Sequence, residues 1–392
     1  MGRKLEREGD GEEDQPGCVN EHPEKARRKA MEKKMFVCWY EELGKEDAAV
    51  VGKKCANLGE MTRLGLDVPP GFALTLALYE MFLQDSGLGE RLARYIGSLE
   101  NLKGAGVGCL QQVSAEFRGM IENEPMPVSA ADLICEHYDE LCKRVGIANI
   151  PVAVRSAGVE SRPGMFETYL NIVGKEAVVA NVKKVWASAF TPRAIAFRIA
   201  KGLAIDCDML GVAVIKMVNA TAAGIGFTID PVLGDDTKVI IEANWGLGEG
   251  VVSGVENVDR WTVDKETLKI VERSVGTKVK CVVYMEKGAD WAEVPPAKQD
   301  KPCLSDEEIK AVAEVAIHLE QRLGKPQDME WALDPDFPTG KNVFLLQTRP
   351  AKTVAKKAAP EVRTVADRLV SGVRSVDLSK AVEKVKNIAF KF

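Results

Sequence analysis

Two short β-type segments near residue 340 limit most strongly what this chain can fold into. The first is Asp328–Trp331 and the second is Phe344–Pro350, with a Pro- and Gly-containing turn between them. Side chains alternate between the two faces of a strand, so Gln347 and Arg349 are predicted to share one face. Carboxylate and amide oxygens suit magnesium, and a guanidinium suits phosphate oxygens. The pair favours a magnesium–polyphosphate site, with an ordinary charged surface hairpin as the alternative.

The composition is that of an ordinary globular protein. With 46% hydrophobic residues and a net charge of −5, the 392-residue chain has no basic footprint, so no nucleic-acid partner is expected. It has no apolar run of membrane-spanning length and no signal peptide, so no membrane partner is expected either. Its nine scattered cysteines form no C-x-x-C pair, which favours free thiols. We therefore expect a cytoplasmic protein.

Changes in composition divide the chain into four parts. Residues 1–34 are predicted to form a charged flexible tail, and 35–208 a helix-rich subdomain. Residues 209–350 contain short β-rich segments and are predicted to form a sheet-rich subdomain. Within it, 305–323 is the clearest helix, beginning with a capping box. Residues 351–392 form a linker and an amphipathic segment. The pattern predicts an α+β fold with a ligand between the subdomains.

A lysine pair lies where a helix is predicted to begin. Lys53 and Lys54 follow Gly52, and helix N-termini attract anions. The spacing is not that of a P-loop, and a solvated lysine pair is the alternative interpretation.

A second candidate site is a glycine-bearing loop that follows a predicted strand ending at Arg155. Glycines let backbone N–H groups approach phosphate oxygens closely, and hydroxyls add donors. An ordinary surface loop is the alternative. The loop residues with this chemistry are Ser156, Gly158, Ser161, Gly164 and Thr168.

Other motifs do not support competing chemistries. The glycines of Glu242–Gly250 have G-x-G-x-G spacing and lie among short strands, so a dinucleotide fold is rejected. His22, His137 and His318 have no cysteine, acid or serine at ligand or triad spacing, so each is interpreted as structural or solvated.

Four sequence blocks, taken together, resemble a known family. They cover roughly residues 36–350 and read VGKKCANLGEMTRLGLDVPPGFALT, VRSAGVESRPGMFETYLNIVG, VIIEANWGLGEGVVSG and DMEWALD…NVFLLQTRP. In this order they resemble the N-terminal nucleotide-binding region of phosphoenolpyruvate synthase and pyruvate phosphate dikinase. The resemblance implies an ATP-grasp fold of two subdomains with the nucleotide between them.

The resemblance also implies site residues, with ATP and magnesium as cofactors. Glu330 and Gln347 would hold magnesium, and Glu242 lies in a matching block and would contribute to ATP binding. The residues implied at the ATP phosphates are Lys54, Arg155, Gly164, Thr168 and Arg349. The lysine and the two arginines among them are also implied as catalytic. The chain departs from the family pattern at Lys53 and Cys55, where glycines are usual, and at Ile215, where glutamine is usual.

Full-length relatives add a swivelling domain whose histidine accepts phosphate, and a barrel that binds pyruvate. Neither fits after Pro350, so the resemblance implies a separate subunit that carries the histidine and binds the small-molecule acceptor. In content the chain resembles the ATP-binding subunit of phenylphosphate synthase. It would pass the β,γ-diphosphoryl group of Mg-ATP to the partner histidine, giving AMP and phosphate, for phosphorylation of phenol.

Two further hypotheses stay open at this point. A split phosphoenolpyruvate synthase acting on pyruvate would have the same sequence features. The substitutions at Lys53, Cys55 and Ile215 are also compatible with a non-catalytic ATP-sensing or scaffold subunit. A thiol-based redox protein is disfavoured because no cysteines are paired.

Overall fold

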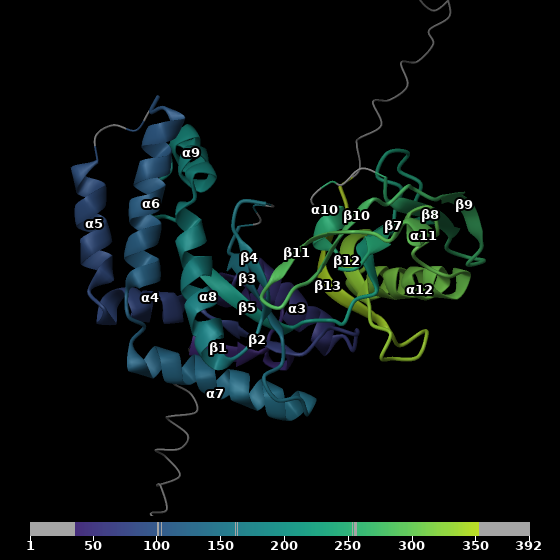
Figure 1. Cartoon of the computed structure of the whole chain (residues 1–392), viewed down its shortest axis with the longest axis horizontal. Coiled ribbons are helices and arrows are strands. Elements are labelled where there is room, and N and C mark those ends of the chain that lie inside the picture. The colour runs from purple at the N-terminus through teal and green to yellow at the C-terminus, as the bar shows by residue number, and fades with distance from the viewer. Residues whose placement is uncertain are drawn as a thin grey trace, which may run out of the picture.

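Two antiparallel sheets, each with its own helices, form the body of the chain (Figure 1). The structure is a computed structural model, and it describes residues 36–352 except 100, 101, 103, 161, 163, 253, 255 and 256. The tail predicted at 1–34 lies outside this range, as does the amphipathic segment predicted near the C-terminus. Figure 1 shows most helices gathered around the first sheet, with the second sheet at the other end of the molecule. This arrangement confirms the predicted α+β class.

The first sheet has five strands in the order β1-β2-β5-β3-β4. Its strands are β1 (Val37–Trp39), β2 (Gly71–Leu74), β3 (Val152–Gly158), β4 (Thr168–Ile172) and β5 (Leu210–Lys216). Its helices are α2 (Ala48–Val51), α3 (Lys53–Arg63), α4 (Leu76–Asp85), α5 (Leu88–Ser98), α6 (Val107–Asn123), α7 (Val128–Val145), α8 (Lys175–Ala187) and α9 (Pro192–Lys201).

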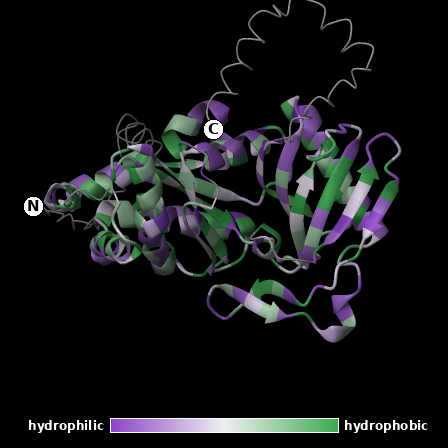
Figure 2. Ribbon diagram, turned by 90° about the horizontal axis from the view of Figure 1, so that it is seen from above, coloured by the Kyte–Doolittle hydropathy of each residue, from purple (hydrophilic) through white to green (hydrophobic). Residues whose placement is uncertain are grey.

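The second sheet has six strands in the order β13-β12-β6-β7-β8-β9. Strands β10 and β11 form a separate two-stranded hairpin, seen below the second sheet in Figure 2, and Val282 of β10 bridges to Gly246 and Leu247 just after β7. The strands are β6 (Ala222–Phe227), β7 (Lys238–Trp245), β8 (Asp259–Asp264), β9 (Ile270–Ser274), β10 (Lys280–Tyr284), β11 (Ala289–Glu293), β12 (Gln327–Leu333) and β13 (Val343–Pro350). The helices are α10 (Glu249–Val252), α11 (Pro296–Gln299) and α12 (Asp306–Leu323).

The change from one sheet to the other comes later than the boundary predicted at residue 208. Strand β5, which the prediction placed in the sheet-rich half, pairs with β2 and β3 of the first sheet. It is buried on both faces, with Val212 and Val214 on the helical side and Ala213 and Ile215 on the other. A strand buried on both faces is uniformly apolar, so its sequence does not reveal which sheet it joins.

Alternation along β3 directs one set of its side chains toward the second sheet. Val152 and Val154 pack in the core formed with α7 and α8. Ala153 and Ala157 belong to the other core, which includes α3. Arg155 lies between these two alanines in the period-two pattern, so β3 presents its guanidinium to the α3 side of the sheet. Helix α3 itself contacts strands of both sheets.

Helix α12 covers one face of the second sheet. Its apolar stripe, including Ile309 and Val312, shares a core with Met329 and Trp331 of β12. The side chains that alternate with this pair, Asp328 and Glu330, therefore lie on the face away from α12. No helix in the described ranges is both long enough and apolar enough to cross a membrane.

The capping box predicted at the start of α12 is confirmed. The Ser305 hydroxyl accepts a hydrogen bond from the Glu308 amide at 3.3 Å, and the Glu308 carboxylate accepts one from the Ser305 amide at 2.7 Å. The helix ends at Gly324, whose φ of 68° is left-handed. Both ends therefore match the local sequence signals.

We expect Ser305→Ala to lower the free energy of unfolding by about 1 kcal/mol, because one amide of the first turn loses its acceptor. Urea denaturation of the full chain measures the change. Ser98→Ala is a matched control, since the Ser98 hydroxyl donates to the Tyr95 carbonyl at the exposed end of α5 and caps no helix N-terminus. Equal losses in the two variants would contradict a capping role for Ser305.

Candidate active site

Arg155 joins the two sheets at the centre of the candidate site. Its Nη2 lies 3.2 Å from Glu330 Oε2 on β12, and its Nη1 donates to the Leu346 carbonyl of β13 at 3.3 Å. The Arg155 and Glu330 side chains are only 16% and 19% exposed. Arg155 Nε is buried and has no hydrogen-bond partner among the described residues. A buried unpaired N–H of a cation is a ready donor for an anionic ligand.

Glu330 contacts side chains of both sheets. Its second oxygen, Oε1, accepts a hydrogen bond from Gln347 Nε2 at 2.8 Å. In the sheet register Gln347 pairs with Glu330 and Arg349 pairs with Asp328. Paired residues of neighbouring strands share a face, so the predicted placement of Gln347 and Arg349 on one face is confirmed. That face is the one opposite α12 and toward Arg155.

Asp328 belongs to this group, although the sequence analysis assigned it no role. Its Oδ2 lies 2.6 Å from Arg349 Nε, and the Arg349 side chain remains 46% exposed. The signal was present in the sequence, because Asp328 and Glu330 alternate along one strand in the same way as Gln347 and Arg349. An exposed guanidinium at the edge of an acidic pair can turn toward a phosphate without leaving the surface.

Lys54 lies in the first turn of α3, beside Arg155. The preceding Gly52 has a φ of 80°, and a Cβ there would lie 2.0 Å from the Ala157 carbonyl oxygen. This close approach requires glycine and docks the start of α3 on the end of β3. Burial and the nearby Arg155 guanidinium lower the pKa of Lys54 to about 8, while the Glu330 carboxylate opposes the shift. Two adjacent cations with one carboxylate favour a further anion.

We expect ATP affinity to fall as pH rises through about 8, because the protonated ammonium of Lys54 binds phosphate and the neutral amine does not. The loss approaches about tenfold for each pH unit above the pKa. Calorimetric titration of ATP between pH 7 and pH 9.5 measures it. Lys54→Arg should remove most of the pH dependence, since arginine stays charged throughout. An unchanged pH profile in that variant would contradict the role of Lys54.

Thr168 and Gly164 lie on the loop side of the site. Thr168 begins β4 and pairs directly with Arg155, so the two side chains share a face. Gly164 lies in the connection between β3 and β4, where its φ is 65° and its surface is exposed. The structure thus places Thr168 next to Arg155 and leaves Gly164 at the outside of the loop.

Glu242 lies further away on the same face of the second sheet. Ile225 of β6 pairs with Glu330 on one side and with Glu242 on the other. Two strand spacings separate the acids, which is about 10 Å. Glu242 instead lies 3.6 Å from Arg260 of β8. Most of the implied site residues therefore gather around Glu330, whereas Gly164 and Glu242 lie apart from this group.

The oxygen donors on this face fit a magnesium ion. No three histidine, cysteine or acidic side chains gather as a metal cluster in the described part of the chain. Asp328, Glu330 and Gln347 nevertheless supply two carboxylates and one amide on neighbouring strands. Magnesium is commonly held by one or two carboxylates, with substrate phosphates and water completing its shell. The donor set therefore suits magnesium that arrives with a polyphosphate.

The departures from the family pattern are mostly core positions. Cys55 and Ile215 are buried and belong to the core between β3, β5 and α3, whereas Lys53 is exposed. Among the histidines, His137 packs against Trp39, and His318 Nε2 lies 3.3 Å from Arg322 Nε on α12. Neither belongs to the group around Glu330, and His22 lies outside the described residues.

Two facing sheets, with a lysine and an arginine opposite an acid–amide pair, define an ATP-grasp nucleotide-binding domain. The family model for the pyruvate phosphate dikinase AMP/ATP-binding domain matches residues 48–368. The chain belongs to this family, and ATP is therefore its nucleotide class.

Curated relatives agree with this assignment. The chain is 38% identical over 385 residues to a probable phosphoenolpyruvate synthase of Staphylothermus marinus, covering 91% of this chain and 46% of the relative. It is 40% identical over 328 residues to a probable phosphoenolpyruvate synthase of Methanothermobacter thermautotrophicus, covering 82% and 46%. It is 34% identical over 358 residues to the phosphoenolpyruvate synthase of Aeropyrum pernix, covering 83% and 43%. The chain thus spans less than half the length of these relatives.

Proposed function

We propose that this chain is the ATP-binding part of a dikinase of the phosphoenolpyruvate synthase type, with Mg-ATP bound between its two sheets. The observation that carries the proposal is the Arg155–Glu330 bridge between the sheets, with Gln347 on the same carboxylate. The names of the relatives favour pyruvate as the final acceptor over phenol, which was the first expectation from the sequence.

The residues around Glu330 suit the positioning that phosphoryl transfer requires. Arg155 offers an unpaired Nε, and Lys54 is protonated below a pKa of about 8, so both can neutralise phosphate oxygens. Arg349 reaches the same face from the exposed edge. Asp328, Glu330 and Gln347 would hold magnesium, which neutralises phosphate charge when bound. Catalysis here consists mainly of orienting the phosphates and stabilising their charge.

The proposal places the base of the nucleotide on the same face of β12, beyond Glu330. Ala332 lies two residues beyond Glu330 on β12 and clusters with Val218 and Ala223. Val218 belongs to the segment that connects β5 to β6, where the chain passes from one sheet to the other. An apolar patch beside a polar phosphate site is the arrangement expected for a nucleotide pocket.

The proposed transfer uses a histidine that lies on a separate subunit. A histidine nitrogen would attack the β-phosphorus of ATP, forming an N–P bond as the bond to the bridging oxygen of the α-phosphate breaks. AMP leaves with that oxygen. Water then removes the terminal group as inorganic phosphate, and the remaining phosphohistidine passes its phosphoryl group to the acceptor. His137 and His318 are both engaged away from the group around Glu330, which supports a histidine outside this set.

The test uses ATP labelled at the β-phosphate, with magnesium and the purified chain, alone and with extract from its source. The proposal expects AMP and an acid-labile label on a second polypeptide only when extract is present. Unlabelled pyruvate should then remove the label, whereas removal by phenol alone would restore the phenol hypothesis. Label on this chain itself would contradict a separate histidine subunit.

An ATP-sensing or scaffold subunit is the second candidate function. The observations that favour it are the departures at Lys53, Cys55 and Ile215. A sensor or scaffold subunit should bind ATP tightly but produce neither AMP nor labelled protein. The extract used in this test must be shown to contain active kinases. AMP production in the same assay would exclude it.

A further inference from the structure

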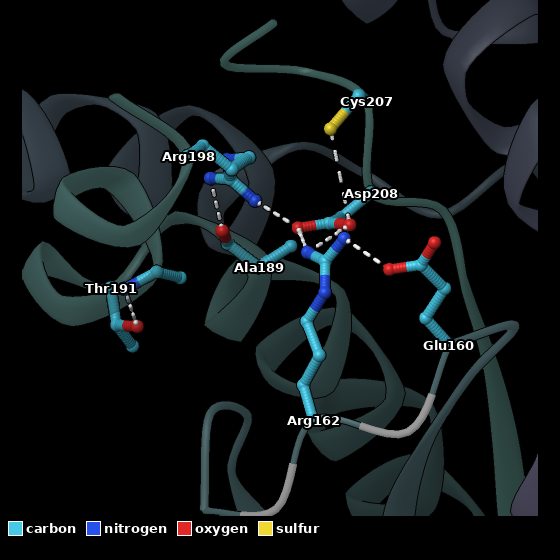
Figure 3. Close-up of polar contacts among 8 residues, drawn as sticks. Glu160, Arg162, Ala189, Thr191, Arg198, Cys207 and Asp208 are labelled. Carbon is cyan, nitrogen blue, oxygen red and sulfur yellow. Dashed lines mark hydrogen bonds and ion pairs between the residues drawn. The ribbon is translucent and has the colours of Figure 1, made fainter. Parts of the chain in front are cut away.

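An ion-pair network outside the group around Glu330 anchors the loop between β3 and β4 (Figure 3). Arg162 comes from this loop, and its Nη1 lies 2.6 Å from both carboxylate oxygens of Asp208. Its Nη2 lies 3.0 Å from Glu160 Oε2. Arg198 of α9 approaches Asp208 from the other side, with Nη1 2.6 Å from Oδ2. Figure 3 shows both guanidinium groups converging on Asp208.

The network consists of a buried ion pair, Arg198–Asp208, and the loop residue Arg162 that binds to it. Arg198 is fully buried, Asp208 is 11% exposed, and Arg198 Nη2 also donates to the Ala189 carbonyl at 2.5 Å. Glu160 is 73% exposed, so its pairing with Arg162 is weakened by solvent. Asp208 therefore carries most of the attraction that holds Arg162. Asp208 lies two residues before β5, so this anchor is next to the start of a central strand of the first sheet.

A second ion pair holds the other end of the same loop, where it enters β4. Glu167, the residue before β4, receives both terminal nitrogens of Arg118 from α6, each at 3.1 Å. The Tyr169 hydroxyl donates to the same carboxylate. Two parallel N–H···O bonds fix geometry as well as distance. The loop is thus attached to α6 on one side and to the base of β5 on the other.

Between these two ends of the loop, Gly164 is exposed, whereas Phe166 packs against the core of the first sheet. The Met165 amide donates to the Arg162 carbonyl at 3.2 Å, which closes a turn containing Gly164. A Cβ built on Gly164 would meet no described heavy atom within 4 Å. A turn that is anchored at both ends and exposed at Gly164 is suited to covering a ligand, because its backbone is held in place and glycine permits close approach.

We propose that Arg162 is a positioning residue that, through Asp208 and Arg198, presents the Gly164 turn to the phosphates of the nucleotide. The inference rests on the proposed function, since it requires ATP to bind between the sheets. An anchored loop loses less conformational entropy when a ligand arrives, so anchoring strengthens binding of the groups that the loop covers. It should have no effect on parts of the nucleotide that the loop does not reach.

Arg162→Met tests this role in the full chain. Methionine removes the guanidinium but leaves Asp208 paired with Arg198, so no buried carboxylate loses its only partner. Affinity for ATP should fall by about tenfold, as expected for loss of preorganisation, while affinity for adenosine stays unchanged. Arg162→Lys should recover part of the ATP affinity, because it restores one charged contact to Asp208. Calorimetry, with competition for the weaker ligand, gives both constants.

Arg118→Met removes the Arg118–Glu167 ion pair at the other end of the loop and should show the same selective loss of ATP affinity. Arg273→Met is the control, because it removes an exposed pair with Asp306 on the second sheet. Hydrogen exchange of residues 164–167 without nucleotide should quicken in Arg162→Met and not in the control. An equal loss of affinity for ATP and adenosine, or unchanged hydrogen exchange, would overturn this inference but leave the proposed function standing. Failure of the unaltered chain to bind ATP would instead overturn the proposed function.

Discussion

Arg349→Ala should reduce AMP formation in the labelled-ATP assay by about a thousandfold or more, the range known for arginines that stabilise a phosphoryl-transfer transition state. Arg349 lies at the end of β13 on the face that carries Asp328 and Glu330, and its Nε is 2.6 Å from Asp328 Oδ2. Its side chain is 46% exposed and belongs to no hydrophobic cluster, so the substitution should leave the hydrophobic core unchanged. The rate of AMP release at saturating ATP, measured with the complementing extract, gives the effect.

Arg349→Lys and Arg273→Ala are the controls for this result. Lysine keeps the charge but lacks the planar fork, so it should restore only part of the activity. The Arg273 variant removes a guanidinium of similar exposure on β9 and should retain full activity. Unfolding in urea should show some loss of stability in Arg349→Ala, where the 11% exposed Asp328 carboxylate loses its ion pair, and little change in Arg273→Ala, whose pair is exposed. Normal AMP release by Arg349→Ala would remove this arginine from the proposed mechanism.

Features that depend on local sequence were predicted correctly. The shared face of Gln347 and Arg349 follows from strand alternation alone, and the sheet register confirms it. The start and end of α12 follow from Ser305, Glu308 and Gly324, each of which acts within a few residues of itself. Such features need no knowledge of how distant segments pack.

Features that depend on distant pairing could not be read in the same way. Arg155 and Glu330 are 175 residues apart, and their contact exists only because the two sheets face each other. The position of β5 was missed because its apolar side chains would suit the middle of either sheet. Asp208, the last residue of the predicted helix-rich subdomain, pairs with both Arg162 and Arg198, which are distant from each other in the sequence.

The resemblance to a family supplied the candidate site residues, and the structure separates them into a connected group and a more distant residue. Lys54, Arg155, Glu330 and Gln347 form one connected group. Glu242 lies two strands away, so it suits a different part of the nucleotide from the phosphates that are proposed to bind near Glu330. A list of matching residues cannot express such distances, because sequence order does not encode the spacing between strands.

Glu330→Gln should remove most of the strengthening effect of magnesium on ATP binding. One oxygen of the Glu330 carboxylate already accepts a hydrogen bond from Gln347, and the other accepts one from Arg155. Glutamine can keep one acceptor, so the contact between the sheets is weakened but not lost, whereas the negative charge that attracts the metal disappears. Magnesium affinity should fall by roughly a hundredfold or more, since even the loss of groups that only support ligands costs up to that amount.

The measurement compares the dissociation constant of ATP with magnesium and with EDTA, in the unaltered chain and in two variants. Glu242→Gln is the matched control, because it removes a carboxylate from the same sheet face about two strand spacings away. That variant should keep the full magnesium effect. In Glu330→Gln, ATP affinity without magnesium should change little or improve, because a negative charge near the phosphates is gone. Equal magnesium dependence in both variants would mean that Glu330 serves to join the sheets and that the metal is held elsewhere.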